Sequence, residues 1–358
     1  MICLVDLPRP VHGVANINKV MLREFVESGL EVKVINTVPS YAWFLFPNKA
    51  WTICKALHTF YCFIKFFFHS VFNVGGIVYR PINGGFGQVY DLVYLFLAKI
   101  FLNRIYIHHH AFDYINKYKV LFYLVNFVAG NKAVHIVLGD KMGEALSELY
   151  RIEKKNIRVV SNLAFFEQPV IQQRKNFDGK LKLGYLANLS IEKGVKSFVD
   201  VCRSLKVMGV NYEAKIAGPF SDSRSERVVR SIIEENDAVE YVGPLYKEDK
   251  TEFYQSLDCF VFPSKNEAEP LVLYEAALFG AYLVGTRYGC MQGMIESLRG
   301  FSVVDDGDVA ICIAQAIHHA TESDTFNFKK RSIRVECFND ERIRSMQLLS
   351  NLIKELGD

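Results

Sequence analysis

Residues 259–286 read CFVFPSKNEAEPLVLYEAALFGAYLVGT, and the architecture of the chain can be predicted from this segment. It contains an apolar run at 259–263, a polar loop, a helical stretch from about Leu271, and a second apolar run at 281–286. Short uninterrupted apolar runs separated by a helix are typical of parallel strands that helices cover on both faces. The segment therefore predicts α/β architecture.

The same alternation of apolar runs and helical patterns continues along the whole chain. Further strands are expected at 2–7, 31–37, 76–80, 105–109, 135–139, 181–186, 212–218 and 239–243. Helices are expected around 16–28, 194–208 and 224–236. This pattern predicts two doubly wound sheets, each with ligands at the carboxyl ends of its strands, facing each other across a cleft.

The length of 358 residues predicts about two domains, at roughly 100–200 residues per domain. Half of the residues are hydrophobic and 23% are charged, which excludes an intrinsically disordered chain. The polar, aperiodic stretch FEQPVIQQRKNFDGK (166–180) is the best linker candidate. We predict a first domain at 1–167, a linker at 168–180, a second domain at 181–340, and a C-terminal helix at 341–358 that can pack back on the first domain.

The net charge of +3 is the sum of two unequal parts. Residues 1–170 hold 18 Lys and Arg against 11 Asp and Glu, net +7, and the remainder holds 24 against 28, net −4, so that 7 − 4 gives +3. No Asp or Glu lies between Glu31 and Asp91, a stretch with five cations: Lys33, Lys49, Lys55, Lys65 and Arg80. This asymmetry predicts an anionic partner, either nucleic acid or a membrane surface.

The segment WTICKALHTFYCFIKFFFHSVF (51–72) departs from the α/β pattern because it combines many aromatic residues with Lys55 and Lys65. Three interpretations stay open. It is a buried helix whose lysines reach the solvent, a helix that lies on an anionic lipid surface, or a membrane-spanning helix.

The cysteines and the N-terminus indicate the compartment. Eight cysteines are spread along the chain with no CxxC pair, which favours a reduced cytosolic setting. The start MICLVDLPRP has no basic region ahead of its apolar run, so it predicts a first strand rather than a signal peptide. We expect a cytoplasmic protein.

The strongest local signal is the pair Glu267 and Glu275, which are eight residues apart around the start of a helix. Backbone N–H groups near Leu271 and Val272, just after Pro270, would point outward there and favour a phosphate. The segment PSKNEAEPLVLYEAALFG resembles the Glu-x7-Glu signature of the retaining glycosyltransferases of glycosyltransferase family 4, also called group 1. The likeness is close over 158–310 and looser over 1–157, and it implies the GT-B fold with two Rossmann-like domains.

The resemblance also implies a diphosphate-binding segment at LGYLANLSIEKGVKSF (183–198). Lys193 matches the Lys of that segment, but Asn188 stands where the family has an Arg. A neutral amide does not replace a charged bidentate group, so another cation must compensate or diphosphate binding is weaker. Arg9, in the loop after the first strand, is the substitute we predict.

In the first domain, DLPRPVHGVANINK (6–19) resembles the family's loop in which a small residue, here Gly13, lets the backbone approach the donor phosphates. His12 beside it is an auxiliary candidate. The run YIHHHAFDY (106–114) matches the place where the family has a His that faces the donor sugar. His110 aligns best, with His109 and His108 as alternatives.

Three further segments resemble turns of the family's donor site. Asn162 matches the Asn of the segment that closes the first domain, and Gly218 matches a glycine turn at a strand end. The backbone of Val242, Leu245 and Tyr246 would lie against the nucleobase. For each, an ordinary turn between strand and helix is the alternative.

We expect no metal site and no cofactor, and the nucleotide-sugar is a co-substrate. The three adjacent histidines have no further ligand at a suitable spacing. Asp306 and Asp308 have the spacing of a metal-binding DxD, but Asp308 precedes a helical pattern and is predicted to cap it.

The resemblance implies sugar transfer with retention at the anomeric carbon. Lys193 and the helix start at Leu271 would neutralise the leaving diphosphate, Glu267 and His110 would hold sugar hydroxyls, and Glu275 the ribose. The basic, aromatic first domain suits a lipid-linked glycan acceptor at the cytoplasmic face of a membrane, as in bacterial surface polysaccharide synthesis. A catalytically impaired nucleotide-sugar-binding subunit and a nucleotide-sugar epimerase are the alternatives, and a nucleic-acid partner ranks last because no such module is present.

Overall fold

The computed structural model of the chain describes residues 1–8, 13–45, 48–166, 177, 179–234, 236–265, 267–303 and 308–357. The chain divides into two compact units, which we describe separately. Unit 1 comprises Met1–Phe166 with Ser345–Asp358, and unit 2 comprises Glu167–Arg344. Most of the predicted linker 168–180 lies outside the described residues.

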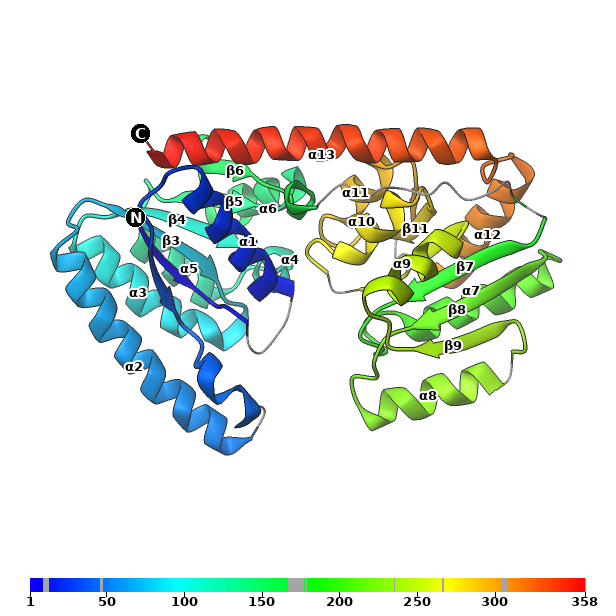
Figure 1. Cartoon of the computed structure of the whole chain (residues 1–358), viewed down its shortest axis with the longest axis horizontal. Coiled ribbons are helices and arrows are strands. Elements are labelled where there is room, and N and C mark those ends of the chain that lie inside the picture. The colour runs from blue at the N-terminus through cyan, green and yellow to red at the C-terminus, as the bar shows by residue number, and fades with distance from the viewer. Residues whose placement is uncertain are drawn as a thin grey trace. The chain divides into compact units, whose positions relative to one another are not determined.

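Unit 1 contains a six-stranded parallel sheet in the order β2-β1-β3-β4-β5-β6 (Figure 1). Its strands are β1 (Ile2–Val5), β2 (Lys33–Asn36), β3 (Ile77–Ile82), β4 (Arg104–His109), β5 (Val134–Val137) and β6 (Ile157–Val159). The central strands are buried along their length, because helices cover both faces of the sheet.

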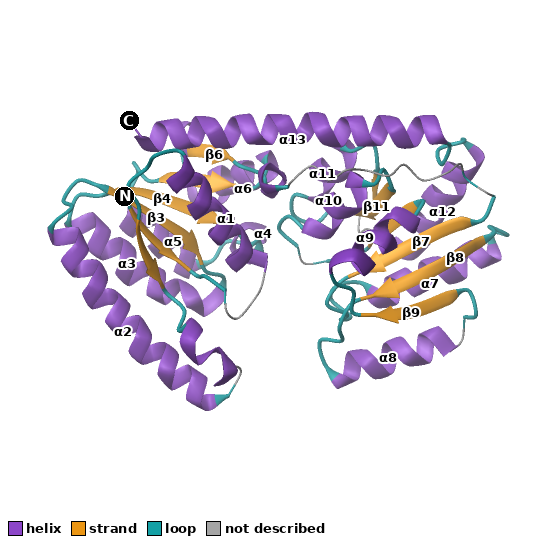
Figure 2. Ribbon diagram, viewed as in Figure 1, coloured by secondary structure: helices purple, strands orange, loops and turns teal. Residues whose placement is uncertain are grey.

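The helices of unit 1 lie in two layers (Figure 2). One layer holds α1 (Gly13–Glu27) and the last turns of α13 (Phe328–Gly357), which share a core through Phe25, Leu349 and Leu352. The other layer holds α2 (Lys49–Val71), α3 (Gln88–Ile100) and α5 (Val120–Ala129), which contact one another in that order. Shorter elements complete the unit: η1 (Ser40–Leu45), η2 (Gly85–Gly87), α4 (Asp113–Asn116), α6 (Asp140–Tyr150), η3 (Lys154–Asn156) and η4 (Asn162–Phe165).

Unit 2 contains a second six-stranded parallel sheet, in the order β12-β11-β10-β7-β8-β9. Its strands are β7 (Leu181–Leu186), β8 (Tyr212–Ala217), β9 (Val239–Gly243), β10 (Cys259–Phe262), β11 (Tyr282–Thr286) and β12 (Phe301–Val303). Its helices are α7 (Val195–Val207), α8 (Ser223–Glu234), α9 (Lys247–Ser256), α10 (Leu271–Leu278), α11 (Met291–Ser297), α12 (Val309–Glu322) and the first part of α13.

The two doubly wound parallel sheets confirm the predicted α/β architecture. Every predicted strand is present with a shift of a few residues at its ends. Two strands were not predicted, β6 and β12, and both have only three residues. The predicted helix cap is confirmed, because the Asp308 carboxylate accepts hydrogen bonds from the N–H groups of Ala310 and Ile311.

The aromatic segment 51–72 forms most of α2, which is half buried. Trp51, Cys62 and Phe66 face the protein, and the opposite side of the helix is exposed. No helix among the described residues is long and apolar enough to cross a membrane. One cation of this acid-free stretch, Arg80, is not available to an external anion. Its side chain is 2% exposed, because it pairs with Asp91 inside unit 1. Arg80 therefore adds no charge to an anion-binding surface.

Candidate functional site

Strand order locates the best site of unit 2 at the carboxyl ends of β7 and β10. These neighbours are the point from which the chain winds outward in both directions, through β8 and β9 on one side and through β11 and β12 on the other. The loops that leave two such strands diverge and open a crevice for ligands. Here the loop after β7 carries Lys193, and the loop after β10 carries Glu267.

Lys193 and Glu267 form an ion pair at this point, with Nζ 2.6 Å from Oε1. The backbone of Lys193 is fixed at both ends: its N–H donates to Ser190 Oγ at 3.2 Å, and its carbonyl accepts from the Tyr185 hydroxyl at 2.8 Å. The next residue, Gly194, has φ +85°, and a Cβ there would lie 2.2 Å from the carbonyl oxygen of Pro263. Glycine therefore lets the two loops approach closely enough for the pair to form.

The environment of the pair sets its charge. Burial raises the pKa of Glu267 above its ordinary range, and the ammonium of Lys193 opposes that shift. The side chains are 32% and 19% exposed, so both can be reached from solvent. The pair thus holds a cation and a carboxylate side by side at the mouth of the crevice, and an incoming anion would compete with Glu267 for Lys193.

Glu275 lies in the second turn of α10 and is held from α9. One carboxylate oxygen accepts from Lys250 Nζ at 2.6 Å, and the other accepts from the Tyr254 hydroxyl at 2.7 Å. Burial, with a contribution from Glu275, raises the pKa of Tyr254 well above its ordinary value, so Tyr254 stays a donor. Sequence reasoning missed Lys250 and Tyr254, although their spacing of four residues puts them on one face of a helix.

The start of α10 is the predicted phosphate site. Pro270 is buried and precedes the helix, whose first residues, Leu271 and Val272, are partly exposed. Pro270, at the N-cap position, makes no capping hydrogen bond through its side chain. The first N–H groups of a helix have no partner within it, so a ligand can use them.

The other predicted donor residues of unit 2 lie along the same sheet edge. Gly218 has φ +122°, a Cβ there would lie 1.8 Å from the Ala187 carbonyl oxygen, and its N–H donates to the Gly243 carbonyl at 2.9 Å. This hydrogen bond places residues 242–246 beside Gly218, at the edge of the sheet where the strands have their carboxyl ends. Tyr246 is exposed, and Val242 and Leu245 are partly exposed. Asn188, also exposed, follows β7 on the same side.

In unit 1 the corresponding point lies between β1 and β3. Gly13 is the first residue of α1, and a Cβ there would meet no atom within 4 Å, so the protein itself does not require glycine at this position. Arg9 and His12 lie outside the described residues. Asn162 is buried in η4, after β6.

The histidine run is brought to the end of β4 but serves different purposes. His109 has no free ring nitrogen, because Nδ1 is hydrogen-bonded to the Tyr114 hydroxyl at 2.9 Å and Nε2 to His135 Nδ1 at 3.0 Å. His108 uses Nδ1 for the Tyr79 hydroxyl at 2.6 Å. The buried His110 Nε2 has no hydrogen-bond partner among the described residues, and burial lowers the pKa of His110 to about 4. His108 Nε2 also has no hydrogen-bond partner among the described residues, but His108 is fully buried. His110 is partly exposed, so of the three it best suits a ligand.

A buried network that the sequence analysis missed lies beside His110, because β3 and β4 pair Ile82 with His109 and end together. Arg80 Nε donates to Asp91 Oδ1 at 2.8 Å, and Asp91 also accepts from the N–H of Asn83 at 3.0 Å and from its amide at 2.9 Å. This network fixes the turn after β3. A single Arg in the otherwise apolar run GIVYRPI was the signal that could have revealed it.

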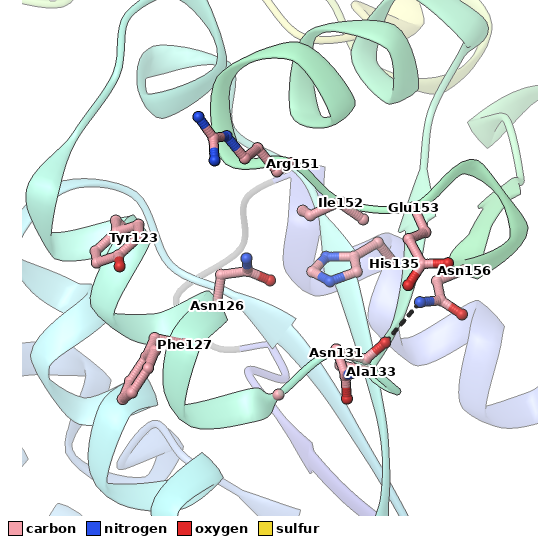
Figure 3. A pocket seen from close by; sticks show the side chains of 11 residues that line it. Tyr123, Asn126, Phe127, Asn131, Ala133, His135, Arg151, Ile152, Glu153 and Asn156 are labelled. Atoms are coloured by element: carbon pink, nitrogen blue, oxygen red, sulfur yellow. Dashed lines mark hydrogen bonds between the residues drawn. The ribbon is translucent and has the colours of Figure 1, made fainter.

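A pocket of about 330 Å³ opens elsewhere in unit 1, where β5 begins rather than where it ends (Figure 3). Tyr123, Phe127 and Asn126 of α5 line one side, and Arg151 and His135 line the others. The Asn156 amide donates to the Asn131 carbonyl at 2.8 Å at its rim. None of the predicted site residues lines this pocket.

Comparison with known proteins finds a family model that is similar to the second unit. Residues 167–330 match the family model of the group 1 glycosyl transferases. A stretch of 156 residues is 28% identical to the colanic acid biosynthesis glycosyltransferase WcaL of Escherichia coli K12. This match covers 40% of the chain and only 37% of WcaL.

Similar solved structures cover nearly the whole chain. Anabaena Alr3699/HepE in complex with UDP has a TM-score of 0.70 at 14% identity, with 99% of each chain covered. The lipopolysaccharide outer core galactosyltransferase WaaB has a TM-score of 0.65 at 14% identity, covering 95% of this chain and 99% of WaaB. This likeness confirms the predicted GT-B fold. At these identities it carries the fold alone, so the residue roles stay predictions.

Proposed function

We propose that the protein transfers a sugar from a nucleotide diphosphate-sugar to a glycan acceptor, with retention at the anomeric carbon and without a metal ion. The observation that carries this proposal is the Lys193–Glu267 pair at the divergence of the loops after β7 and β10. The group 1 family match over the same unit supports it.

The chemistry follows from what each group offers. The leaving group is a nucleoside diphosphate, so the reaction needs stabilisation of negative charge more than a strong base. Lys193 and the uncapped start of α10 supply positive charge and N–H donors. When the diphosphate draws Lys193 away, Glu267 becomes free to accept hydrogen bonds from sugar hydroxyls.

The remaining groups bind rather than react. Glu275, with both oxygens already oriented by Lys250 and Tyr254, is proposed to hold the ribose hydroxyls. The backbone of 242–246 is proposed to lie along the base. His110 is kept as a candidate partner of a sugar hydroxyl because its Nε2 is buried and unused.

The acceptor is proposed to be a lipid-linked glycan of bacterial surface polysaccharide synthesis, reached by a cytoplasmic protein that binds the membrane peripherally. WcaL is named for colanic acid synthesis and WaaB for the lipopolysaccharide outer core, and both names support this class of acceptor. HepE was solved with UDP and with UDP-glucose, so UDP-sugars are the first donors to test.

A thermal-shift screen against UDP-, GDP-, ADP- and dTDP-sugars identifies the donor, because a ligand that binds only the folded state raises its apparent stability. Turnover of that donor is then measured in EDTA with a glycan acceptor, and the anomeric configuration of the product is read by NMR. We expect a retained configuration, and Glu275→Ala is expected to abolish transfer. Full activity of Glu275→Ala would refute the site.

The same assay separates the alternatives. Donor binding without turnover would identify a nucleotide-sugar-binding subunit. The observation that favours this alternative is the exposed Asn188, at the position where the family has an Arg. A changed sugar formed from donor alone, with no acceptor present, would identify an epimerase.

A further inference from the structure

The outer sides of three helices of unit 1 are unusually apolar for a surface in water. On α2, Leu57 is 69% exposed and Phe60 is 65% exposed, and on α5 Phe127 is 72% exposed. Further large apolar side chains are exposed on the same three helices: Ile53, Tyr61, Ile64, Phe67, Phe68 and Val71 on α2, Val89, Tyr90, Val93, Phe96 and Ile100 on α3, and Val120, Tyr123 and Leu124 on α5. We call these residues the outer apolar face.

The outer apolar face is one continuous surface although its residues come from three segments of the chain. α3 contacts α2 on one side and α5 on the other, and the three helices cover the sheet face opposite α1 (Figures 1 and 2). Helices of this length are roughly 34, 20 and 15 Å long and pack about 10 Å apart. The face therefore exceeds the few hundred Å² that a soluble monomer usually exposes.

The inward sides of these helices already complete the core, so the outer apolar face has no partner within unit 1. Phe66 of α2, Tyr94 of α3 and Phe122 of α5 are each 0–1% exposed. Side chains two residues away from them, such as Phe68, Phe96 and Leu124, point outward. The exposed parts of the outward residues bury no apolar area within unit 1 and remain available to a partner.

The charges on the three helices are of one sign. α2 and α5 contain no Asp or Glu, and the only acid of α3 is the buried Asp91, which is paired with Arg80. Lys49, Lys55 and Lys65 of α2 and Lys99 of α3 are exposed or partly exposed, and Lys117 and Lys119 precede α5. Arg151, at the pocket beside α5, forms no ion pair with another described residue.

We propose that the outer apolar face is the membrane-binding surface of the protein and that it inserts into the interfacial layer of an anionic bilayer. An apolar, aromatic face bordered by lysines suits the boundary between acyl chains and acidic headgroups. The inference names a partner for the proposed function, but it rests on unit 1 alone and does not need the transfer reaction.

Charge selects the bilayer over a second copy of the chain. Two such faces in contact would bring their lysines together without any exposed acid on these helices to pair with them, and like charges across an interface are unfavourable. Anionic lipid pairs with every one of these cations. The sequence alone pointed to the aromatic segment 51–72, whereas the structure adds α3 and α5 to the same surface.

The test measures binding of the full chain to vesicles of phosphatidylglycerol and of phosphatidylcholine by sedimentation at low and high salt. Single substitutions place a charge on each helix: Phe60→Glu, Phe96→Glu and Phe127→Glu. Val26→Glu is the matched control, because Val26 is 59% exposed on α1, in the other helix layer of the same unit. All four sites are exposed, and an unchanged Tm checks that each variant folds.

We expect binding to phosphatidylglycerol vesicles that weakens at high salt. Each of the three substitutions should reduce it by about tenfold or more, and Val26→Glu should leave it unchanged. Equal binding by the wild type, Phe96→Glu and Phe127→Glu would overturn the proposal. So would a wild-type dimer in solution that the same three substitutions dissociate, because that result would assign the face to a second copy.

The outcome is distinguishable from failure of the proposed function. The donor thermal shift uses unit 2 and should be the same in wild type and in the three variants. Vesicle binding without turnover of any donor would leave the membrane surface standing and refute the glycosyltransferase, and the reverse result would refute the membrane surface alone.

Discussion

Each unit contains a six-stranded parallel sheet, but the strand orders differ, and the two sheets place different chemistry at the carboxyl ends of their strands. In unit 2 this edge holds two accessible ion pairs, Lys193–Glu267 and Lys250–Glu275. In unit 1 it holds neutral buried histidines and a charge pair, Arg80–Asp91, that is closed off from solvent. A diphosphate needs cations that it can reach, and among the described residues the edge of unit 2 supplies them. Fold similarity by itself does not identify the site; the exposure of its charges does.

The largest effect is expected from opening the closed pair of unit 1. Asp91→Ala leaves the buried Arg80 without its directly hydrogen-bonded carboxylate, with Asp6 4.0 Å away, which should cost about 3–5 kcal/mol of unfolding free energy. Both tryptophans, Trp43 and Trp51, belong to unit 1, so urea unfolding followed by tryptophan fluorescence reports on this unit.

Glu148→Ala, at an exposed position of α6, serves as the control and should change the midpoint little. The double change Arg80→Met with Asp91→Leu should restore much of the loss, since apolar residues can replace a buried ion pair. An Asp91→Ala variant with the unfolding midpoint of the wild type would show that the Arg80–Asp91 pair is not closed off from solvent.

The accessible pair of unit 2 should matter for catalysis instead. Lys193→Ala is expected to lower kcat about 10²–10³-fold, because one charge-stabilising donor is removed. It should also raise the pKa of Glu267 further, since Lys193 now opposes the effect of burial. The acid limb of the pH–rate profile would then move to higher pH.

Lys196→Ala, an exposed lysine of α7, is the control and should keep wild-type kinetics. A Lys193→Ala enzyme with an unchanged kcat and pH profile would remove Lys193 from the mechanism.

Acid should destabilise unit 1. Burial lowers the pKa of His110 and of His135 to about 4, below the ordinary value of 6.5. Between pH 6.5 and 4 the unfolded chain binds protons that the folded chain does not. The stability contribution of each histidine is therefore complete above pH 6.5 and is lost as the pH falls. The loss is about 1.4 kcal/mol of unfolding free energy per pH unit for each histidine. His110→Asn should reduce the slope by this amount in fluorescence-monitored urea unfolding; an identical slope would show that His110 is not held neutral.

The smallest effect is expected at the support of Glu275. Tyr254→Phe removes one of its two hydrogen-bond donors and leaves Lys250, so donor KM should rise about fivefold, or about 1 kcal/mol, with kcat little changed. Tyr212→Phe is the matched control, because it loses a buried hydrogen bond to the Cys202 carbonyl, away from this edge. Equal KM values in the two variants would show that Tyr254 only supports the fold.

Much of the fold followed from local pattern. Strands such as Leu181–Leu186 and Cys259–Phe262 are apolar runs of the right length, and Asp308 caps a helix as its position predicted. The three-residue strands β6 and β12 carry too few residues for a periodic signal. The candidate residues of unit 2 were found because they fall within a single recognisable motif or at strand ends.

The partners of those residues could not be predicted, because they come from elsewhere in the chain. Lys193 and Glu267 are 74 residues apart, and Lys250 and Glu275 are 25 apart. Which ring nitrogens of the three consecutive histidines are hydrogen-bonded depends on Tyr79, Tyr114 and His135, which only the packed sheet brings within reach.

The sequence by itself therefore determined the α/β architecture and the positions of the strand ends, since apolar periodicity and turn residues act locally. It also showed that the first half is basic and aromatic. The tertiary structure alone determined which charges are neutralised inside the protein, as with Arg80, and which remain accessible. It also gathered α2, α3 and α5 into one outer apolar face, because burial and pairing depend on segments that meet only after folding.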